Sequence, residues 1–214
     1  MVGRAAAIPH GSPALLGYRT AVDYDNVVAS QVGQRPILEL YACYGPISNM
    51  PVWTTRSPGD WNCSSDTGVN LMRQTSASGD ARAMGGTPTD DQLVMARARA
   101  TAFGGSAGQN RWFGIAARYR DASNYYYLAV RDSNTVSLRK QVNGAITVLG
   151  TAPLAVSVNT WYDLRLDAVG NELRAFVNGV QVLQATDSSH AGGQGGMVSY
   201  NAATEYTGYV AWQP

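Results

Sequence analysis

The sequence predicts an all-β protein in which two antiparallel sheets pack face to face as a sandwich. From residue 92 onward, short runs rich in Val, Tyr, Trp, Leu and Thr alternate apolar with polar residues, the period of a strand with one buried face. The joints between these runs carry hairpin-turn residues, and no stretch keeps a helical period over an adequate length. These observations favour a sandwich over a fold of alternating strands and helices.

The predicted strands follow one another at short intervals. They span residues 92–100, 112–120, 124–132, 135–141, 145–149, 161–168, 172–177, 180–185, 196–200 and 205–212. Asn143-Gly144 and Asn178-Gly179 supply the positive φ values that a two-residue type I′ turn needs, and Gly170-Asn171 suits type II′. Three tight hairpins are therefore expected.

Residues 48–91 give a weaker signal. Pro51, Pro58 and Pro88 interrupt them, and only residues 69–75 and 81–84 have the pattern of a strand. We expect long loops here, at one end of the sandwich. Trp53 and Trp61 lie in this part, where they would line a loop or cover the core.

The first 34 residues raise a question of domain organisation. Residues 18–29 align without gaps on residues 200–211 and keep Tyr, Ala, Tyr, Val and Ala at equivalent positions. In one interpretation, residues 1–34 are the tail strand of a preceding repeat in a tandem array. In the other, they form a first strand that pairs within this domain, whose sandwich spans residues 35–214.

Composition argues against two classes of partner. Charged residues make up 14% of the 214 residues, and the formal net charge is +1, so no long-range field attracts nucleic acid or an anionic membrane. No run approaches the roughly 20 apolar residues of a membrane-spanning helix. Residues 1–16 lack the continuous apolar stretch of a signal peptide.

The two cysteines, Cys43 and Cys63, are separated by a loop rich in Pro and Gly. A disulfide between them would stabilise the fold by roughly 3 kcal/mol, mainly by restricting the unfolded chain. The alternative is a pair of free, buried thiols, because sequence spacing does not show that the two Cβ atoms meet.

Four stretches carry a family resemblance: residues 112–127, 160–166, 173–179 and 195–210. They resemble the laminin-G-like jelly rolls of the concanavalin A-like lectin/glucanase superfamily. The resemblance implies a jelly-roll sandwich and a carbohydrate-binding module appended to a secreted, extracellular polysaccharide-degrading protein. Relatives often carry paired acidic residues near a structural calcium, whereas Glu39 and Glu205 stand as single carboxylates. We therefore expect no calcium and no other cofactor.

The residues that would support catalysis are sparse. His10 and His190 lie in segments rich in Gly and Ser, where we expect solvent-exposed loops instead of a triad. No strand carries the paired carboxylates of a retaining glycoside hydrolase. The sequence therefore favours a binding module over an enzyme.

A candidate binding face follows from the alternation. If Phe113, Ile115, Ala117 and Tyr119 point inward, Trp112 and Arg118 point outward, and the neighbouring strands follow the same rule. The outward residues proposed to bind carbohydrate are Arg97, Arg118, Tyr125, Tyr127, Arg131 and Arg139. Aromatic rings stack on sugar C–H faces, and guanidinium groups hold carboxylates with paired hydrogen bonds. The alternative is an ordinary solvated sheet face, on which Arg and Tyr are common.

The leading hypothesis is a non-catalytic module that binds a polysaccharide or oligosaccharide, with an acidic polymer as the preferred ligand. A polysaccharide lyase is the second hypothesis, in which Tyr127 would take the proton next to a uronate carboxyl group. The third is a structural or adhesive repeat without a ligand. Neither nucleic acid nor a membrane is expected as a partner.

Overall fold

The computed structural model of the chain describes residues 35–39, 45–46, 53–55, 61–64, 71–106 and 109–214. All of them belong to one compact unit, Gly33–Pro214. Residues 18–29 lie outside the described ranges, so both interpretations of the N-terminal segment stay open. No described residue lies in a helix, and so no helix that could cross a membrane is found in this part of the chain.

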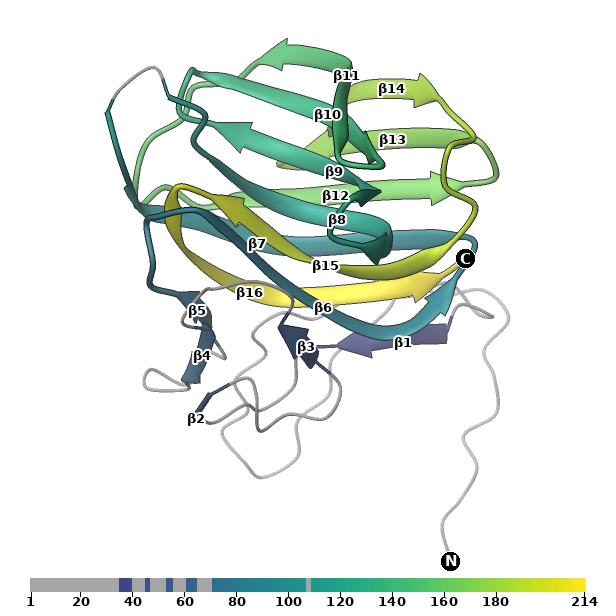
Figure 1. Cartoon of the computed structure of the whole chain (residues 1–214), viewed down its shortest axis with the longest axis horizontal. Helices are drawn as coiled ribbons and strands as arrows, with labels where there is room; N and C mark the ends of the chain where they lie inside the picture. The colour runs from purple at the N-terminus through teal and green to yellow at the C-terminus, as the bar shows by residue number, and fades with distance from the viewer. Residues whose placement is uncertain (1–34, 40–44, 47–52, 56–60, 65–70, 107–108) are drawn as a thin grey trace, which may run out of the picture. The chain divides into compact units, whose positions relative to one another are not determined.

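The described strands form two antiparallel sheets, seen as stacked layers in Figure 1. Sheet A runs in the order β14 (Val180–Thr186), β13 (Glu172–Val177), β12 (Tyr162–Val169), β7 (Gln92–Phe103), β16 (Ala202–Gln213), β5 (Leu71–Gln74), β4 (Trp61–Ser64) and β2 (Gly45–Pro46), and β1 (Arg35–Glu39) also pairs with β16. Sheet B runs β11 (Ala145–Pro153), β10 (Thr135–Val142), β9 (Asn124–Arg131), β8 (Trp112–Asp121), β15 (Gly193–Tyr200), β6 (Asp80–Thr89) and β3 (Trp53–Thr55). The predicted all-β sandwich is confirmed.

The hairpins have the predicted backbone. Asn143 and Gly144 have φ values of 48° and 83°, and Asn178 and Gly179 have 51° and 79°, as a type I′ turn requires. At the third joint Gly170 has a φ of 54°. These turns fix the pairing of β10 with β11, β13 with β14 and β12 with β13.

The core lies between the two sheets and is built from one face of each. Its inward residues include Val94, Ala96 and Ala98 of β7, Tyr126, Leu128 and Val130 of β9, Val136 and Leu138 of β10, and Leu164 and Leu166 of β12. The predicted alternation therefore holds on these strands. Trp53 and Trp61 are also buried here, against Tyr209 and Tyr206 at ring-centroid distances of 5.0 and 6.0 Å.

Strand β8 departs from the alternation through a β-bulge. Phe113, Ile115 and Ala117 enter the core as predicted, but the register with β9 shifts after Ala117, and Arg118 has a φ of 51°. A bulge adds one residue to one strand and reverses the facing of the residues that come after it. Tyr119 consequently lies on the outer face of sheet B, opposite to its predicted inward position.

The same bulge buries Arg118, so its predicted outward position is wrong. Its side chain is 2% exposed, and it donates hydrogen bonds to four carbonyl oxygens and one carboxylate. Its acceptors are Asp90 O at 2.6 Å, His190 O at 2.9 Å, Ala168 O at 3.2 Å, Gly170 O at 2.8 Å and Asp91 Oδ1 at 3.3 Å. Because Ala168 belongs to β12, this guanidinium group links sheet B to sheet A, and we call its set of hydrogen bonds the brace between the sheets.

His190 is also buried, which corrects the expectation of an exposed loop histidine. It is 1% exposed, its ring packs edge-on against Tyr126 at 4.9 Å, and Nε2 lies 2.8 Å from the carbonyl oxygen of Gln141. Burial lowers the pKa of His190, so the neutral imidazole is favoured. The other histidine, His10, lies outside the described residues.

Cys63 is buried and disulfide-bonded. The alternative of a free, buried thiol is therefore wrong for Cys63. The predicted partner, Cys43, lies outside the described residues, so the pairing itself stays a prediction.

Asp187 is a hydrogen-bonded carboxylate between β14 and β15. It accepts bonds from the Tyr126 hydroxyl at 2.7 Å and the Ser189 N–H at 2.9 Å, and the Lys140 ammonium group lies 2.5 Å from its other oxygen. Burial alone would raise the pKa of Asp187, but the bonds from Lys140, Ser189 and Tyr126 outweigh burial and hold it well below the usual range.

We predict that Arg118→Met lowers the free energy of unfolding by about 3–5 kcal/mol, because the acceptors around the buried guanidinium lose their donors. Arg118→Lys should be intermediate, since an ammonium group keeps the charge but lacks the planar fork of donors. Urea unfolding followed by tryptophan fluorescence measures both. Arg120→Met, at the exposed neighbouring position, is the matched control. Equal unfolding midpoints for the Arg118→Met and Arg120→Met variants would contradict the assignment.

We also predict an acid-dependent loss of stability that involves Asp187. A carboxyl group with a depressed folded-state pKa stabilises the fold fully above its unfolded value of about 3.9, and this contribution is lost as the pH falls below that value. The free energy of unfolding should therefore fall below about pH 4, and Asp187→Asn should make the fall shallower. Urea titrations across this range test it, with Asp163→Asn as an exposed control. An identical slope in the Asp187→Asn variant would refute this role.

Candidate carbohydrate-binding face

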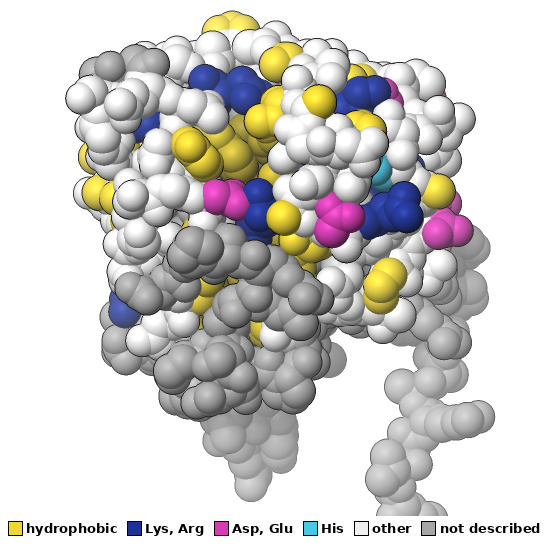
Figure 2. Space-filling view, viewed as in Figure 1, with side chains coloured by type: hydrophobic (Ala, Val, Ile, Leu, Met, Phe, Trp, Pro, Cys, Tyr) yellow, Lys and Arg dark blue, Asp and Glu magenta, His cyan; other side chains and the backbone are white. Residues whose placement is uncertain are grey.

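The outer face of sheet B carries a row of aromatic side chains, which we call the aromatic face. It comprises Trp112, Tyr119, Tyr125, Tyr127 and Tyr200, with Met84, Ala116, Ala129 and Val198 between and beside them. Figure 2 shows hydrophobic side chains gathered in a hollow on this side of the molecule, with basic and acidic side chains around it. The rings therefore form a second apolar cluster on the other side of sheet B from the core. Four of them, Trp112, Tyr119, Tyr125 and Tyr127, are at most 4% exposed, and Tyr200 is partly exposed.

The rings contact one another in sequence. Trp112 stacks on Tyr127 at 5.0 Å and on Tyr200 at 6.4 Å, with interplanar angles of 30° and 14°. Tyr125 lies 5.2 Å from Tyr127 and 5.4 Å from Tyr119. The result is a continuous row from Tyr200 at one end of sheet B to Tyr119 near the other.

The pairing register of β8 with β9 and the small residues on β8 leave space for the row of rings on this side of sheet B. Tyr127 pairs with Ala116, so the ring has space on the neighbouring strand. Gly114 lies opposite Ala129, and a Cβ added to Gly114 would come 1.8 Å from the carbonyl oxygen of Leu128. Only glycine fits this close approach of β8 to β9 beneath the rings.

One edge of the aromatic face carries a partly buried ion pair. Arg82 and Asp80 of β6 pair with each other, and the Arg82 guanidinium carbon lies 5.5 Å from the centroid of the Tyr125 ring. Burial raises the pKa of Asp80, with Arg82 acting in the opposite direction. Burial also raises the pKa of Tyr125 to about 12, again partly offset by Arg82.

The opposite edge carries two arginines. Arg139 donates to the Ser137 hydroxyl at 2.8 Å, and Arg131 donates to the Asn110 side chain at 2.9 Å. Within the described ranges, neither makes an ion pair, and the nearby Asp132 is paired with Arg111. Burial and the charge of Arg139 lower the pKa of Arg131. This edge therefore has a local excess of positive charge.

Two buried donors on the face have no hydrogen-bond acceptor among the described residues: Trp112 Nε1 and Arg82 Nε. Trp112 is 4% exposed and the Arg82 side chain 10% exposed. Buried polar atoms are normally hydrogen-bonded. Unpaired buried atoms also occur in the core of the described part, at Trp61 and Tyr209, so the two donors support a ligand site only together with the row of rings.

Four of the six predicted binding residues lie on this side of sheet B: Tyr125, Tyr127, Arg131 and Arg139. The predicted solvent exposure of the two tyrosines is wrong, because neighbouring side chains leave Tyr125 2% and Tyr127 1% exposed. Arg118 lies in the brace between the sheets, and Arg97 lies on sheet A. There Arg97 stands 3.6 Å from Asp163, with its guanidinium carbon 5.7 Å from the centroid of the Trp161 ring. The predicted single face is thus divided between two sheets.

The sequence reasoning missed other members of the site. Trp112 was predicted to face outward but was not named as a binding residue, and Arg82, Asp80 and Tyr200 were not considered. The strand 81–84 did carry a signal, because Arg82 alternates with the inward residues Ala81 and Ala83. No sequence signal near residues 81–84 indicates that this strand lies beside β15, which itself lies beside β8.

The chemistry of the face suits binding better than proton transfer. Burial is the main influence on the Tyr127 hydroxyl, and it raises its pKa in spite of nearby arginines. A general base would need the ionised phenolate, whose formation is made harder here. The neutral hydroxyl keeps its proton as a hydrogen-bond donor.

No protein-family model matches the chain, and no curated protein matches it either. Solved structures do match. The carbohydrate binding module CBM66 from Bacillus subtilis has a TM-score of 0.64 at 22% identity, over 77% of this chain and 98% of that one. The beta-glucanase of Bacillus licheniformis has a TM-score of 0.55 at 15% identity, over 80% and 97% of the two chains. An alginate lyase from polysaccharide lyase family 7 has 0.57 at 10% identity, over 79% and 99%.

At these identities the likeness is one of fold. It agrees with the two antiparallel sheets described above, and the finer laminin-G-like resemblance stays a prediction. The described part of the chain is a two-sheet β-sandwich similar in fold to a carbohydrate binding module and to a beta-glucanase.

Proposed function

We propose that this chain is a non-catalytic carbohydrate-binding module and that the aromatic face is its binding surface. The observation that carries the proposal is the continuous row of rings from Tyr200 to Tyr119, beside two buried donors without acceptors. Ring faces can pack against sugar C–H groups once neighbouring side chains move aside, since four of the five rings are at most 4% exposed, and the free donors would then bond to sugar oxygens. The fold match to a carbohydrate binding module supports the same assignment.

We further propose that the preferred ligand is an acidic polysaccharide outside the cell. Arg131 and Arg139 support this preference, because neither has a carboxylate partner in the described ranges and their charges lie near each other. A uronate carboxylate or a sulfate group would supply the missing negative charge and accept paired hydrogen bonds.

The test uses polygalacturonate as the acidic polymer and an unbranched neutral glucan as its comparison, with affinity measured by calorimetry. Arg139→Gln should weaken polygalacturonate binding about tenfold, the loss of one charge-assisted hydrogen bond, and should leave the neutral polymer unaffected. Tyr200→Leu should weaken both polymers, because Tyr200 is the partly exposed ring of the row and stacking does not depend on ligand charge. Affinity for the acidic polymer should also fall with added salt, since exposed charges are screened over about 8 Å at physiological ionic strength.

Arg97→Gln is the matched control, because this arginine lies on sheet A, away from the aromatic face. Thermal melting shows whether each variant keeps its fold. The proposal is wrong if neither polymer binds, or if Arg97→Gln weakens binding as much as Arg139→Gln. An ultraviolet assay for unsaturated uronate separates binding from the lyase alternative.

A further inference from the structure

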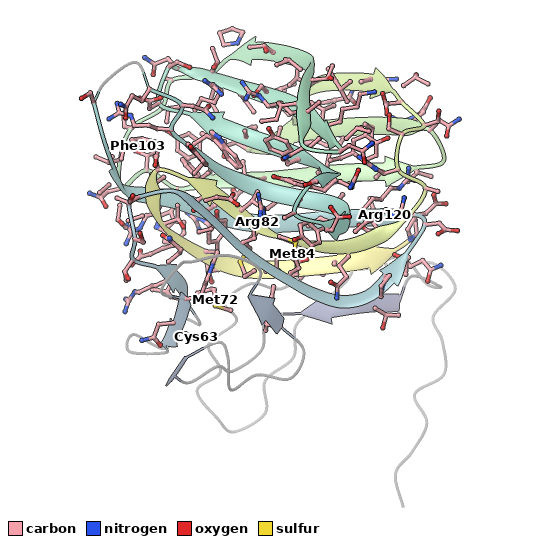
Figure 3. All side chains as sticks on the ribbon, viewed as in Figure 1. Cys63, Met72, Arg82, Met84, Phe103 and Arg120 are labelled. Carbon is pink, nitrogen blue, oxygen red and sulfur yellow. The ribbon has the colours of Figure 1, made fainter. Side chains whose placement is uncertain are left out.

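An open surface pocket of about 430 Å³, which we call the cavity, lies at one end of sheet B, where β6 and β8 end and β15 begins. Its size is within the range of small-molecule sites. Tyr119 lines it and also belongs to the aromatic face, so the cavity adjoins the last ring of the row. Figure 3 labels Arg120, another lining residue, at this end of the sheet beyond Arg82 and Met84.

The wall of the cavity depends on two glycines. A Cβ on Gly193 would lie 2.5 Å from the carbonyl carbon of Arg118, and a Cβ on Gly192 would lie 2.5 Å from Asp90 Oδ1. Larger residues at these positions would push against the backbone or displace the Asp90 carboxylate. The glycines therefore let β15 approach closely while leaving the carboxylate in place.

Neighbouring bonds hold this wall in position. The Arg118 guanidinium binds the carbonyl oxygen of Asp90 at 2.6 Å, and Gln194 Nε2 donates to the carbonyl oxygen of Gly86 at 2.8 Å. The backbone that carries Asp90 is thus anchored to the brace between the sheets. A site whose walls are fixed before binding loses less entropy when a ligand enters.

The cavity carries one charge of each sign. Asp90 and Arg120 both line it and are exposed, and no ion pair within the described ranges joins them to each other or to another residue. A carboxylate accepts hydrogen bonds from hydroxyl groups, and a guanidinium donates to their oxygens. Neighbouring hydroxyls on one sugar ring can satisfy both, whereas a ligand carboxylate would be repelled by Asp90.

We propose that this cavity is a distinct subsite for one neutral sugar residue that presents adjacent hydroxyl groups. Asp90 accepts hydrogen bonds from these hydroxyls, Arg120 donates to them, and Tyr119 connects the subsite to the aromatic face. The inference rests on the proposed carbohydrate-binding function and adds a second ligand chemistry to it. The aromatic face would bind through its rings and through Arg131 and Arg139, which have no carboxylate partner in the described ranges. The cavity would bind through one carboxylate, Asp90, and one guanidinium group, Arg120.

The test is a nuclear magnetic resonance titration of the full chain with the methyl glycosides of glucose, galactose and mannose, and with short neutral oligosaccharides. Amide shifts of Gly192, Gly193 and Gln194 should move with at least one of these sugars. Asp90→Asn and Arg120→Gln should each weaken that binding by about fivefold or more. Both side chains are exposed, so the fold should be kept, and added salt should have little effect on a neutral ligand.

Arg139→Gln serves as the control, because it should leave the neutral monosaccharide unaffected while weakening polygalacturonate. The subsite is overturned if the neutral sugars do not bind while polygalacturonate does. It is also overturned if neutral sugars shift only residues of the Trp112 and Tyr127 region, or if both cavity variants bind like the wild type. Failure of every glycan, polygalacturonate included, would overturn the proposed function and the subsite together.

Discussion

The buried guanidinium group of Arg118 is the interaction on which the arrangement of the two sheets most depends. It belongs to sheet B by sequence but donates to Ala168 of sheet A and to Gly170 just beyond it. A charge removed from water is tolerated only when its donors are satisfied, and here a set of carbonyl oxygens and one carboxylate provides the acceptors. The bulge that turns Arg118 inward also turns Tyr119 outward. One irregularity in β8 therefore builds both the brace and the end of the aromatic row.

Local chemistry explains what the sequence could predict. The Asn-Gly turns require a positive φ at both central residues, and the alternation on β7, β9 and β10 fixes their inward faces without any knowledge of the partner strands. The fold class follows from these two signals, as does the shared orientation of Tyr125 and Tyr127. The alternation within one strand therefore predicts that Tyr125 and Tyr127 share a face of β9.

The errors arise where the structure is set by distant parts of the chain. The bulge at Arg118 depends on acceptors from three other segments, so alternation alone assigns the wrong facing to Arg118 and Tyr119. Arg97 was grouped with residues of β8 and β9 because these strands are consecutive, yet the chain crosses from sheet A to sheet B between β7 and β8. Arg82 joins the face only because β6 pairs with β15, a strand far away in sequence.

The position of β16 has a consequence for how the protein is made. This strand lies in the interior of sheet A, between β7 and β5, although it comes last among the strands described. During synthesis, β7 and β5 leave the ribosome long before their shared neighbour, and their edges stay open until residues 202–213 arrive. Folding that waits for such distant pairing is slow, and open strand edges invite association between chains. Biosynthesis of this sandwich therefore depends on what protects β5 and β7 during that interval.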